Sequence, residues 1–514
     1  MEENVDERSD SKFSDYIPKA QAEGISNNFI EESFGGKRRR SEASRSFPII
    51  FRRRSRRNIQ KNHNIYLLVN IMQNYPQPYQ YQHPFPYYYH YIFYVLFLFI
   101  LIILIICAYI KIRFRFWAMQ PVFHIYDLHY YLFPCGIINY ELPEKNQYTN
   151  FKDIETIQYA KLSDLKLKQF THFIKQHYLQ NGDNQYCPTT KNITGYFTGH
   201  NCTSFFSFYY EDELLIDVKT QAQIPNKKIA GVMTTRPIHI TINTHSTSSK
   251  EYNRKTSTRF ASSTFSSNKA KNADATFEAY YVDYLCVDKT RRKQNIAPQV
   301  IQTHHYNQRL INKNILVSLF KREGDLTGIV PLCVYNTYCF DMNRWAKPPP
   351  LLPYVSLIEV GKTNIHHLFD FFRDHNEKFD ICILTETANM MQLINSKTIY
   401  IYMIIEQGEV ICAYFFRRSY TYLKKGTEVL CCFASINCSK NVELFAHGYK
   451  VALWKIYESH TAFKCAAIEN ISDNDVIVNN ILERSRPIIV NPNAYFFYNF
   501  AYHTFQPKKV LVIN

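Results

Sequence analysis

The chain has 514 residues, which is more than one small hydrophobic core needs, so two domains or one double-lobed domain are expected. Aromatic residues make up 16% and the formal net charge is +16, which favours an anionic partner: nucleic acid, an anionic membrane face or a phosphorylated cofactor. The thirteen cysteines include no CxxC pair, which excludes the common zinc and disulfide scaffolds. We interpret them as reduced thiols, mostly in the core, in a cytosolic compartment.

The N-terminal region has little that could form a core. Residues 1–62 are polar and contain the basic runs GKRRR and RRRSRR, which predict a disordered basic tail. Its arginines could bind RNA or acidic lipid, or they could simply be solvated. Residues 63–90 become rich in Tyr, Gln, His and Pro, which is typical of an extended linker.

Residues 91–110, YIFYVLFLFILIILIICAYI, contain no charge and match the length that a bilayer core demands. A buried helix is the alternative, but the segment is apolar on all sides and therefore favours a transmembrane helix. Lys111, Arg113 and Arg115 follow it and place its C-terminal side in the cytosol, whereas the arginine-rich tail argues for the opposite orientation.

After residue 115 the pattern is that of an α/β protein. A Ser/Thr-rich insertion at 244–274 is expected to be disordered. The order hairpin, strand, helix, strand, strand occurs around 229–335 and again around 398–500, which suggests two similar lobes. Helices are predicted at 163–178, 298–312, 364–376 and 441–459, and strands at 231–242, 278–287, 315–320, 398–406, 409–416, 429–435 and 495–500.

One turn combines a strand end with a cluster of cations. The strand ends at Val287, four cations (Lys289, Arg291, Arg292 and Lys293) follow, and a helix opens near Pro298. Backbone N–H groups at such a turn, together with a helix N-terminus, form a phosphate site. The turn lacks the glycines of ATP-binding and NAD-binding loops, so the diphosphate of coenzyme A fits better. A solvated basic loop is the alternative.

Four segments, in order, resemble the glycylpeptide N-tetradecanoyltransferase (N-myristoyltransferase) family. YLCVDKTRRKQNIAPQVI at 284–301 is similar to its Phe-Leu-Cys-Val and Arg-Ser-Lys-Arg-x-Ala-Pro signature, and RFRFWAMQPV at 113–122 to its Arg-Tyr-x-Phe-Trp-x-Thr-Gln-Pro-Val element. FSFYYEDELL at 206–215 and the end of the chain, YFFYNF with KKVLVIN, are the other two. The resemblance covers roughly residues 113 to 514.

The resemblance implies an α/β fold of two pseudo-symmetric, GNAT-like acyltransferase lobes that share a saddle-shaped sheet. The acyl-CoA-binding lobe would be 111–340 and the peptide-binding lobe 341–514. It implies transfer of a myristoyl group from myristoyl-CoA to the amine of an N-terminal glycine by direct attack, with no prosthetic group and no metal. The amine must first lose a proton, and the resemblance assigns this to the terminal carboxylate of Asn514, carried inward by the apolar strand 510–513.

The resemblance also implies the remaining site residues. The backbone N–H groups of Tyr284 and Leu285 would stabilise the oxyanion, and Thr327 would lie beside the amine. His304, His305, His366 and His367 are interpreted as helix-surface residues, and Cys286 as a core thiol. The acyl-CoA contacts would be Arg113, Phe114, Phe116, Trp117, Leu285, Val287, Arg292, Lys293, Gln294, Asn295 and Ala297, and the peptide contacts Asp183, Phe206, Phe208, Tyr210 and Tyr338.

The departures from the family pattern lie on the peptide side. Asp283 stands where the family has Asn, the acidic run is reduced to NGDN with Asp183, and the segment after Gly328 is shortened to YCFDMN. From the apolar helix and the resemblance together, we expect a membrane-anchored monomer with its catalytic domain in the cytoplasm. It would act on proteins with an N-terminal glycine. The alternatives are an inactive acyl-CoA-binding membrane protein that docks partners and a basic RNA-binding membrane protein; nucleic acid is not the expected partner.

Overall fold

The computed structural model describes residues 85–179, 184–216, 223–243, 275–324, 328–423 and 426–514. The basic tail, residues 63–84 of the expected linker and the Ser/Thr-rich insertion lie outside this part. Residues Tyr87–Asn514 form one compact unit.

The α-helices agree closely with the sequence periodicity. Each of the four helices predicted after residue 115 begins and ends within two residues of its expected bounds. The apolar helix starts earlier than expected, at Phe85, so residues 85–90 are helical rather than an extended linker. The α-helices are α2 (Phe85–Arg113), α3 (Leu128–Leu132), α4 (Asp164–His177), α5 (Thr190–Thr194), α7 (Ile296–Ile311), α8 (Ile365–His375), α9 (Thr387–Asn395), α10 (Val442–Ser459) and α11 (Asn474–Leu482).

The predicted strands are all present, and several are longer than the sequence pattern indicated. The strands are β1 (Gly136–Ile137), β2 (Ile154–Gln158), β3 (Asn184–Tyr186), β4 (Phe205–Ile216), β5 (Gln223–Ile242), β6 (Ala275–Val287), β7 (Val317–Glu323), β8 (Cys333–Asp341), β9 (Val355–Glu359), β10 (Ile381–Leu384), β11 (Ile399–Glu406), β12 (Glu409–Leu423), β13 (Thr427–Asn437), β14 (Phe463–Glu469), β15 (Ile489–Tyr498), β16 (Phe500–Ala501) and β17 (Val510–Ile513).

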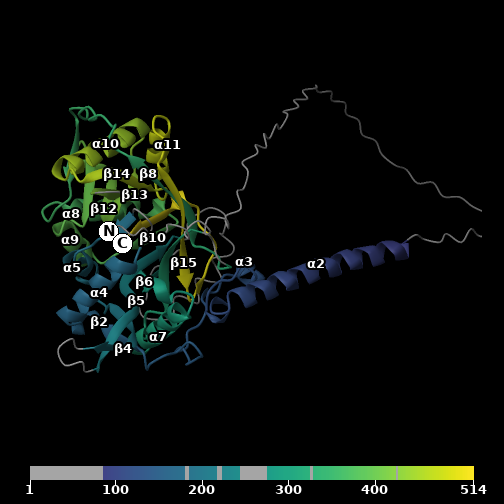
Figure 1. Cartoon of the computed structure of the whole chain (residues 1–514). Coiled ribbons are helices and arrows are strands. Elements are labelled where there is room, and N and C mark those ends of the chain that lie inside the picture. Colours follow the sequence, from purple (N-terminus) through teal and green to yellow (C-terminus); the bar gives the residue numbers. More distant parts are fainter. Residues whose placement is uncertain (1–84, 180–183, 217–222, 244–274, 325–327, 424–425) are drawn as a thin grey trace, which may run out of the picture. The chain divides into compact units, whose positions relative to one another are not determined.

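One mixed sheet of fifteen strands runs through the described unit (Figure 1). Its order is β17-β10-β5-β6-β7-β15-β8-β14-β13-β12-β11-β9, with β4 also on β5, β2 on β4 and β3 on β12. The unit strand, helix, parallel strand occurs twice: β6-α7-β7 and β13-α10-β14. The sequence repeat therefore corresponds to two similar halves of a continuous sheet.

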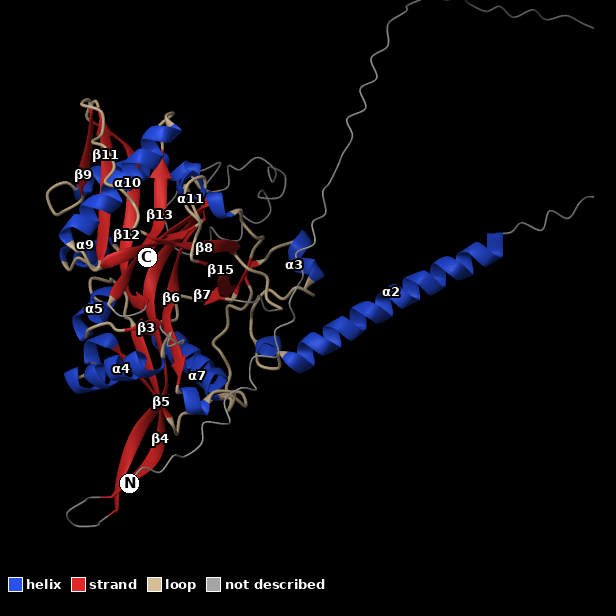
Figure 2. Cartoon of the chain, turned by 45° about the horizontal axis from the view of Figure 1, so that its top comes forward, coloured by secondary structure: helices blue, strands red, loops and turns tan. Residues whose placement is uncertain are grey.

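In the first half of the sheet, α4 and α7 pack on opposite faces of β4, β5 and β6 (Figure 2). Because side chains alternate along a strand, Tyr284 and Cys286 of β6 join the core under α4, whereas Met233 of β5 joins Ile296 and Val300 of α7. The Ser163 hydroxyl caps the start of α4 by accepting from the Lys166 N–H.

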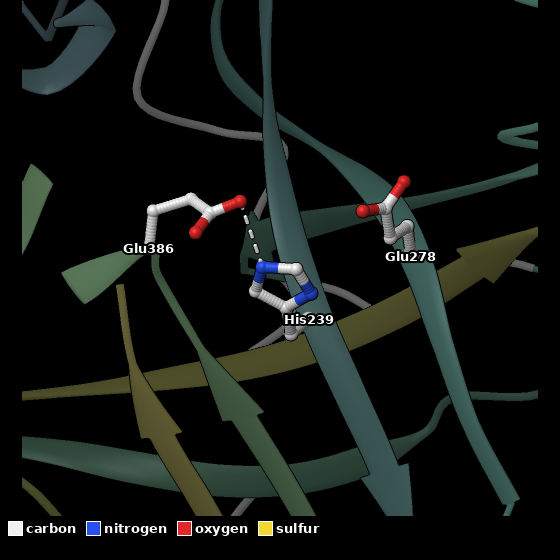
Figure 3. A group of neighbouring side chains, drawn as sticks. All are labelled: His239, Glu278 and Glu386. Carbon is white, nitrogen blue, oxygen red and sulfur yellow. Dashed lines mark ion pairs between the residues drawn. The ribbon is translucent and has the colours of Figure 1, made fainter. Parts of the chain in front are cut away.

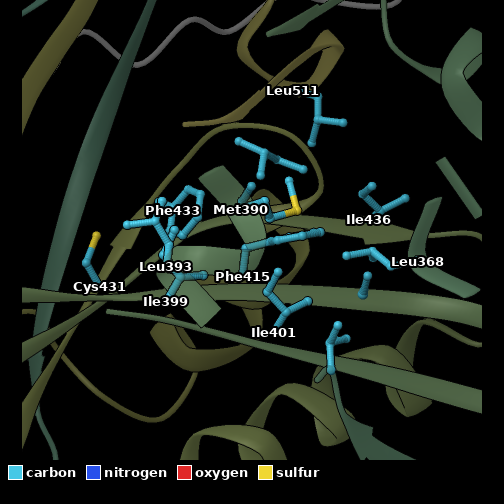
Figure 4. Close-up of a cluster of buried hydrophobic side chains, with 14 of the residues drawn as sticks. Leu368, Met390, Leu393, Ile399, Ile401, Phe415, Cys431, Phe433, Ile436 and Leu511 are labelled. Carbon is cyan, nitrogen blue, oxygen red and sulfur yellow. The ribbon is translucent and has the colours of Figure 1, made fainter. Parts of the chain in front are cut away.

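In the second half, two separate clusters cover the two faces. One cluster joins strands β11 to β13 to α8 and α9, and the other joins the same strands to α10 and α11. Figure 4 shows the first of these, in which Leu368, Met390 and Leu393 pack against Ile401 and Phe415. Leu511 of the last strand belongs to this cluster, so the end of the chain is part of the core.

The last strand, β17, confirms the strand predicted at 510–513. It pairs in parallel with β10, from Ile381 opposite Val510 to Leu384 opposite Ile513. The Thr385 N–H donates to the Ile513 carbonyl at 2.9 Å. These bonds fix the position of Asn514, which is fully buried.

Candidate functional site

The first cavity opens where β6 and β7 part. Ala279–Val282 of β6 pair in parallel with Val317–Phe320 of β7. Both strands extend beyond these residues, but there they no longer pair with each other. A cavity of about 420 Å³ lies between the separated ends. Its lining is mostly apolar and includes Trp117, Met233, Val282, Leu285, Ile301 and Phe320.

A β-bulge shapes β6 beside this cavity. Met233 pairs with Leu285 and Thr235 with Val282, so Asp283 and Tyr284 together lie opposite Thr234. The predicted oxyanion donors are Tyr284 and Leu285, and both are at or next to the bulge. The Tyr284 N–H donates to the Thr234 Oγ1 at 3.2 Å, so this donor already has an acceptor.

The basic turn joins β6 to α7 and has a distinctive backbone. Lys293 and Asn295 have φ values of 67° and 61°, in the left-handed region. Asn295 precedes α7 and makes no side-chain capping bond, so the first N–H groups of the helix face the turn. This is the arrangement expected of a phosphate-binding helix N-terminus.

Gly231 lets α7 begin this close to the sheet. It pairs with Val287 on β6, and a Cβ at this position would lie 2.9 Å from the Ile296 Cγ2. The Asp288 N–H donates to the Ala230 carbonyl at 2.9 Å, which fixes the start of the turn against β5. A larger residue at 231 would push the helix N-terminus away.

The cations of the turn differ from one another in their binding partners. Arg291 pairs with Glu211 at 3.0 Å, and the Arg292 guanidinium donates to the His177 carbonyl at 3.0 Å. Lys293 is exposed and makes no ion pair with any described residue. Arg292 and Lys293 both line a cavity of about 580 Å³ that also includes Val287, Asn295 and Ala297, as the resemblance implies.

A third cavity, of about 780 Å³, connects the turn to the segment after α2. Phe114, Phe116 and Trp117 line it together with Asn295 and Ala297. Leu285 lines all three of these cavities, and the residue is 38% exposed. The predicted acyl-CoA residues thus lie together, except Gln294, which lines none of these three cavities, and Arg113, whose side chain lies outside the described part.

On the other side of Asp283 is a polar cavity of about 370 Å³ between the two halves of the sheet. Buried ion pairs line it. Arg236 Nε donates to Asp283 Oδ1 at 3.0 Å and to Oδ2 at 3.1 Å. Glu469 pairs with Arg417 at 3.1 Å and Lys321 at 3.2 Å. Of these residues only Asp283 was noted from the sequence, as a departure from the family pattern, because the partners in each ion pair are far apart in the chain.

The two ion-pair groups have different electrostatics. Burial alone would raise the pKa of Glu469, but Lys321, Arg417 and the Tyr335 hydroxyl hold that pKa at about 2. For Asp283, burial outweighs Arg236 and Arg417, so its pKa is raised above the ordinary value. Glu469 is therefore a fixed anion, whereas Asp283 is the more basic carboxylate.

Asn514 lies near the polar cavity. The Arg417 Nη1 donates to its side-chain Oδ1 at 3.3 Å, and the residue is fully buried. It lines none of the four cavities described here. Thr327 and Asp183, two further predicted site residues, lie outside the described residues.

The four predicted peptide contacts that the structure describes do not line the polar cavity. Phe206 and Phe208 are fully buried and pack around Phe170 under α4. Tyr210 is half-buried and stacks on Phe208. Tyr338 stacks on Phe340, while its neighbours on β8, Thr337 and Cys339, line the cavity from the other strand face.

Two histidines differ from the expectation. His304 and His305 were predicted on the helix surface, but both are buried, and burial lowers the pKa of each to about 3. His304 bridges the hydroxyls of Ser207 at 2.8 Å and Thr235 at 2.9 Å. His305 lines the cavity between β6 and β7. His366 and His367 are exposed, as predicted.

Cys286 is buried, as predicted for a core thiol, and burial raises its pKa to about 12.

A separate group of side chains of the types that bind metal ions joins β5, β6 and the start of α9 (Figure 3). His239 and Glu278 are cross-strand partners, and His239 Nε2 lies 2.9 Å from Glu386 Oε1. Their ligand atoms lie within 4.8 Å of one another, but none of the three residues lines the cavities above.

No protein-family model and no curated protein sequence matches the chain. A crystal structure of Saccharomyces cerevisiae N-myristoyltransferase with bound myristoyl-CoA superposes with a TM-score of 0.54 at 11% identity, covering 76% of this chain and 94% of that one. The chain has the N-myristoyltransferase fold.

A second structure of the yeast enzyme with bound myristoyl-CoA gives a TM-score of 0.55 at 10% identity and covers 77% of this chain and 90% of that one. A third, with myristoyl-CoA and inhibitors, gives 0.51 at 12% identity. At these identities the likeness concerns the fold. The N-myristoyltransferase fold is therefore built here from a sequence that keeps few of the same side chains.

Proposed function

We propose that this protein transfers a myristoyl group from myristoyl-CoA to the N-terminal glycine amine of proteins. The observation that carries the proposal is the position of Leu285, where a basic turn, an aromatic cavity and an apolar cavity meet within an N-myristoyltransferase fold. The phosphates would bind at Lys293 and the N-terminus of α7, and the acyl chain would lie between β6 and β7.

Physical chemistry supports phosphate binding at the basic turn and acyl-chain binding in the apolar cavity. Helix N-H groups and cations favour phosphate, and each buried methylene contributes about 0.8 kcal/mol. The thioester would then lie near Leu285 and the β-bulge, where the Tyr284 N–H would have to leave the Thr234 Oγ1 before it donates to a developing oxyanion. The polar cavity on the far side of Asp283 would receive the acceptor peptide.

The acceptor amine must lose a proton before it attacks, because much of it is ammonium at neutral pH. The resemblance assigns this step to the carboxylate of Asn514. Its complete burial beside Arg417, at the end of a strand that β10 holds, supports a fixed rather than a frayed position.

The test is transfer of an alkyne-tagged myristoyl group from its CoA ester to a library of peptides with N-terminal glycine. We expect labelling of glycyl peptides and none of matched N-acetylated peptides. A variant extended by two glycines after Asn514 should lose transfer but still bind acyl-CoA. Equal activity of the extended form would contradict the role of the terminal carboxylate, and no labelling by the intact protein would contradict the proposed function.

We also propose that α2 anchors the protein in a membrane, with the folded domain in the cytoplasm. Residues His90–Ile112 are long and apolar enough to cross a bilayer, and none of their most apolar stretch is buried by the protein. The exposed apolar residues continue just beyond the helix with Ile125, Leu128 and Phe133, and Lys111 lies over the Tyr126 ring. This surface would lie at the interface between lipid and water.

Flotation with phospholipid vesicles tests the anchor. A variant with Lys at Leu98, Ile102 and Ile105 should stay with the soluble fraction, because each lysine in the centre of a bilayer costs roughly 3 kcal/mol. The matched control carries Lys at the exposed positions Leu310, Tyr354 and Val442 and should still float. Flotation of the first variant would contradict anchoring by α2.

One observation favours a second candidate, an inactive acyl-CoA-binding protein that docks partners. The Tyr284 N–H, an expected oxyanion donor, is bound to Thr234 Oγ1. Thr234→Val would free this donor without a change in side-chain shape. If the intact protein binds myristoyl-CoA but labels no peptide, and the variant gains transfer, the second candidate is correct.

A further inference from the structure

Three side chains of the types that bind metal ions meet at one place on the sheet, and none of them lines the cavities described above. His239 of β5 and Glu278 of β6 are cross-strand partners, and Glu386 immediately precedes α9. One ligand atom from each residue lies within 4.8 Å of the other two. Figure 3 shows the imidazole of His239 between the two carboxylates. The group therefore gathers one nitrogen ligand and two oxygen ligands from three segments of the chain.

The sheet fixes the backbone on which this group is built. Ile238 and Ile240 are fully buried in the core, so His239, which lies between them, is on the opposite face of β5. On its other side β5 pairs with β10, where Leu384 is the partner of His239 and Glu386 follows two residues later. The three residues thus lie on, or just beyond, the neighbouring strands β6, β5 and β10, and ladder hydrogen bonds hold these strands side by side.

The group carries an excess of negative charge. Among the described residues Glu278 forms no ion pair, and Glu386 pairs only with His239, whose Nε2 lies 2.9 Å from its Oε1. The side chain of Glu386 is 13% exposed and that of His239 is 35% exposed, so water screens these charges only in part. Two carboxylates this close repel each other, and a cation bound between them would remove the repulsion.

Two side chains from a separate segment orient the carboxylates. The Asn201 Nδ2 donates to Glu386 Oε1 at 3.0 Å, and the Cys202 Sγ lies 3.7 Å from Glu278 Oε2. Both residues belong to the segment that leads into β4. Outer partners of this kind fix the orientation of metal ligands, and their loss typically weakens metal binding. Each glutamate of the group therefore has a neighbour that is not itself one of the three ligands.

The types of ligand atom select among the common cations. Zn²⁺ binds imidazole nitrogen and carboxylate oxygen at about 2.0–2.2 Å, usually in a tetrahedron, and a water often completes a site with three protein ligands. At these bond lengths the ligand atoms of a tetrahedral site are about 3.3 Å apart, which small side-chain rotations reach from the present arrangement. Ca²⁺ requires six to eight oxygen ligands and Mg²⁺ an octahedral oxygen shell, so both fit this group poorly.

We propose that His239, Glu278 and Glu386 bind one Zn²⁺ ion, which joins β5, β6 and the start of α9. This metal site is separate from the proposed acyl-transfer site and does not depend on that function. Its effect on the fold follows from the residue before Glu386, because the Thr385 N–H donates to the Ile513 carbonyl at 2.9 Å. A metal ion that holds Glu386 against the sheet also stabilises the segment to which the last strand, β17, is bonded.

Calorimetric titration of the full-length protein in detergent with Zn²⁺, after treatment with a chelator, tests the site. We expect the wild type to bind one more Zn²⁺ ion per chain than Glu278→Gln, a substitution at a partly exposed residue that leaves the core intact. His239→Gln and Glu386→Gln should weaken binding at this site by at least about 10–100-fold, the loss that changes in outer partners alone can cause. Asn201→Ala, which removes such a partner, should weaken it by roughly tenfold.

Thermal unfolding separates a metal site from a purely structural effect. With chelator present, Glu278→Gln should have the wild-type Tm, and added Zn²⁺ should raise the Tm of the wild type but not that of the variant. The matched control, Gln at the exposed positions His366 and His367, should bind Zn²⁺ and gain stability as the wild type does. An equal rise in Tm for the wild type and Glu278→Gln would overturn the site, and an equal rise with Ca²⁺ or Mg²⁺ would overturn its assignment to zinc. Neither readout requires acyl transfer, so a protein that labels no peptide still tests the metal site.

Discussion

The guanidinium of Arg417 joins the end of the chain to a buried carboxylate of the polar cavity: its Nη1 donates to Asn514 Oδ1 at 3.3 Å, and its Nη2 donates to Glu469 Oε1 at 3.1 Å. The same guanidinium lies over the Phe433 ring at 4.3 Å. Arg417 thus joins β12, β14 and the end of β17, three segments that lie far apart in the sequence. Its removal should loosen the site as a whole.

Arg417→Met should lower the free energy of unfolding by about 2 kcal/mol, because Glu469 would keep only Lys321 as a buried cationic partner. Denaturant unfolding of the wild type and the variant measures the difference. The matched control is Arg373→Met, since Arg373 is 72% exposed and pairs only with exposed carboxylates. That control should change stability by less than about 0.5 kcal/mol, and an equal effect of both variants would contradict this prediction.

Lys293→Ala should weaken the binding of myristoyl-CoA by roughly tenfold, because a charge-assisted contact to phosphate contributes on the order of 1.5–3 kcal/mol. Calorimetric titration measures the affinity. Myristoyl-pantetheine, which lacks the diphosphate, should bind both proteins equally. Lys440→Ala, at an exposed lysine outside the site, serves as the control. A loss of affinity for myristoyl-pantetheine would place Lys293 near the acyl chain instead.

Ser318→Leu should shift the preferred acyl chain to a shorter one. Ser318 lies opposite Tyr280 in the paired part of β6 and β7 and lines the apolar cavity at that end. The three added carbon atoms would displace a similar number of methylenes, each contributing about 0.8 kcal/mol. Binding constants for acyl-CoAs of graded length measure the shift, and an unchanged preference would show that the chain does not reach Ser318.

Acid should destabilise the fold below pH about 6.5 through His304 and His305. Their folded pKa of about 3 lies below the ordinary value, so the unfolded chain binds more protons between these limits. Stability therefore falls as pH falls, by about 1 kcal/mol per histidine between pH about 7.5 and 5.5. Unfolding at these two pH values should show a smaller loss for the variant with Gln at both positions.

Burial also lowers the pKa of His200, to about 4. His200 is unchanged in that variant, so the variant should still lose some free energy of unfolding as the pH falls. If the wild type and the double variant lose the same free energy between the two pH values, the buried histidines do not control acid stability. The comparison uses the difference between two pH values for each protein, so a constant effect of the substitutions on stability cancels.

The sequence predicted the elements well because burial follows local periodicity. Helix α10 has an apolar residue at nearly every helical repeat, and β17 is an uninterrupted apolar strand. The residues expected to contact acyl-CoA could be grouped for a similar reason: they lie in two continuous segments, 113–117 and 284–298, that carry a recognisable motif. The β-bulge at Asp283 left no such signal, since a register shift depends on the partner strand.

The polar cavity could not be predicted from local patterns. Arg236, Arg417 and Glu469 come from three strands that meet only after the sheet is complete, and their charges resemble those of solvated strand residues. His304 and His305 were placed wrongly for a similar reason: polar side chains on a helix usually indicate a surface. In the structure the buried hydroxyls of Ser207 and Thr235 bind His304 inside the core.

The separation of β6 and β7 has a consequence for folding as well as for chemistry. Beyond Val282 and Phe320 the two strands exchange no ladder hydrogen bonds, so nothing in the backbone closes the sheet there. A fatty acyl chain bound between them would pack against side chains of both strands. Amide hydrogen exchange in this pair should then slow when the proposed lipid donor is present, and the protein would unfold most cooperatively as a complex with that donor.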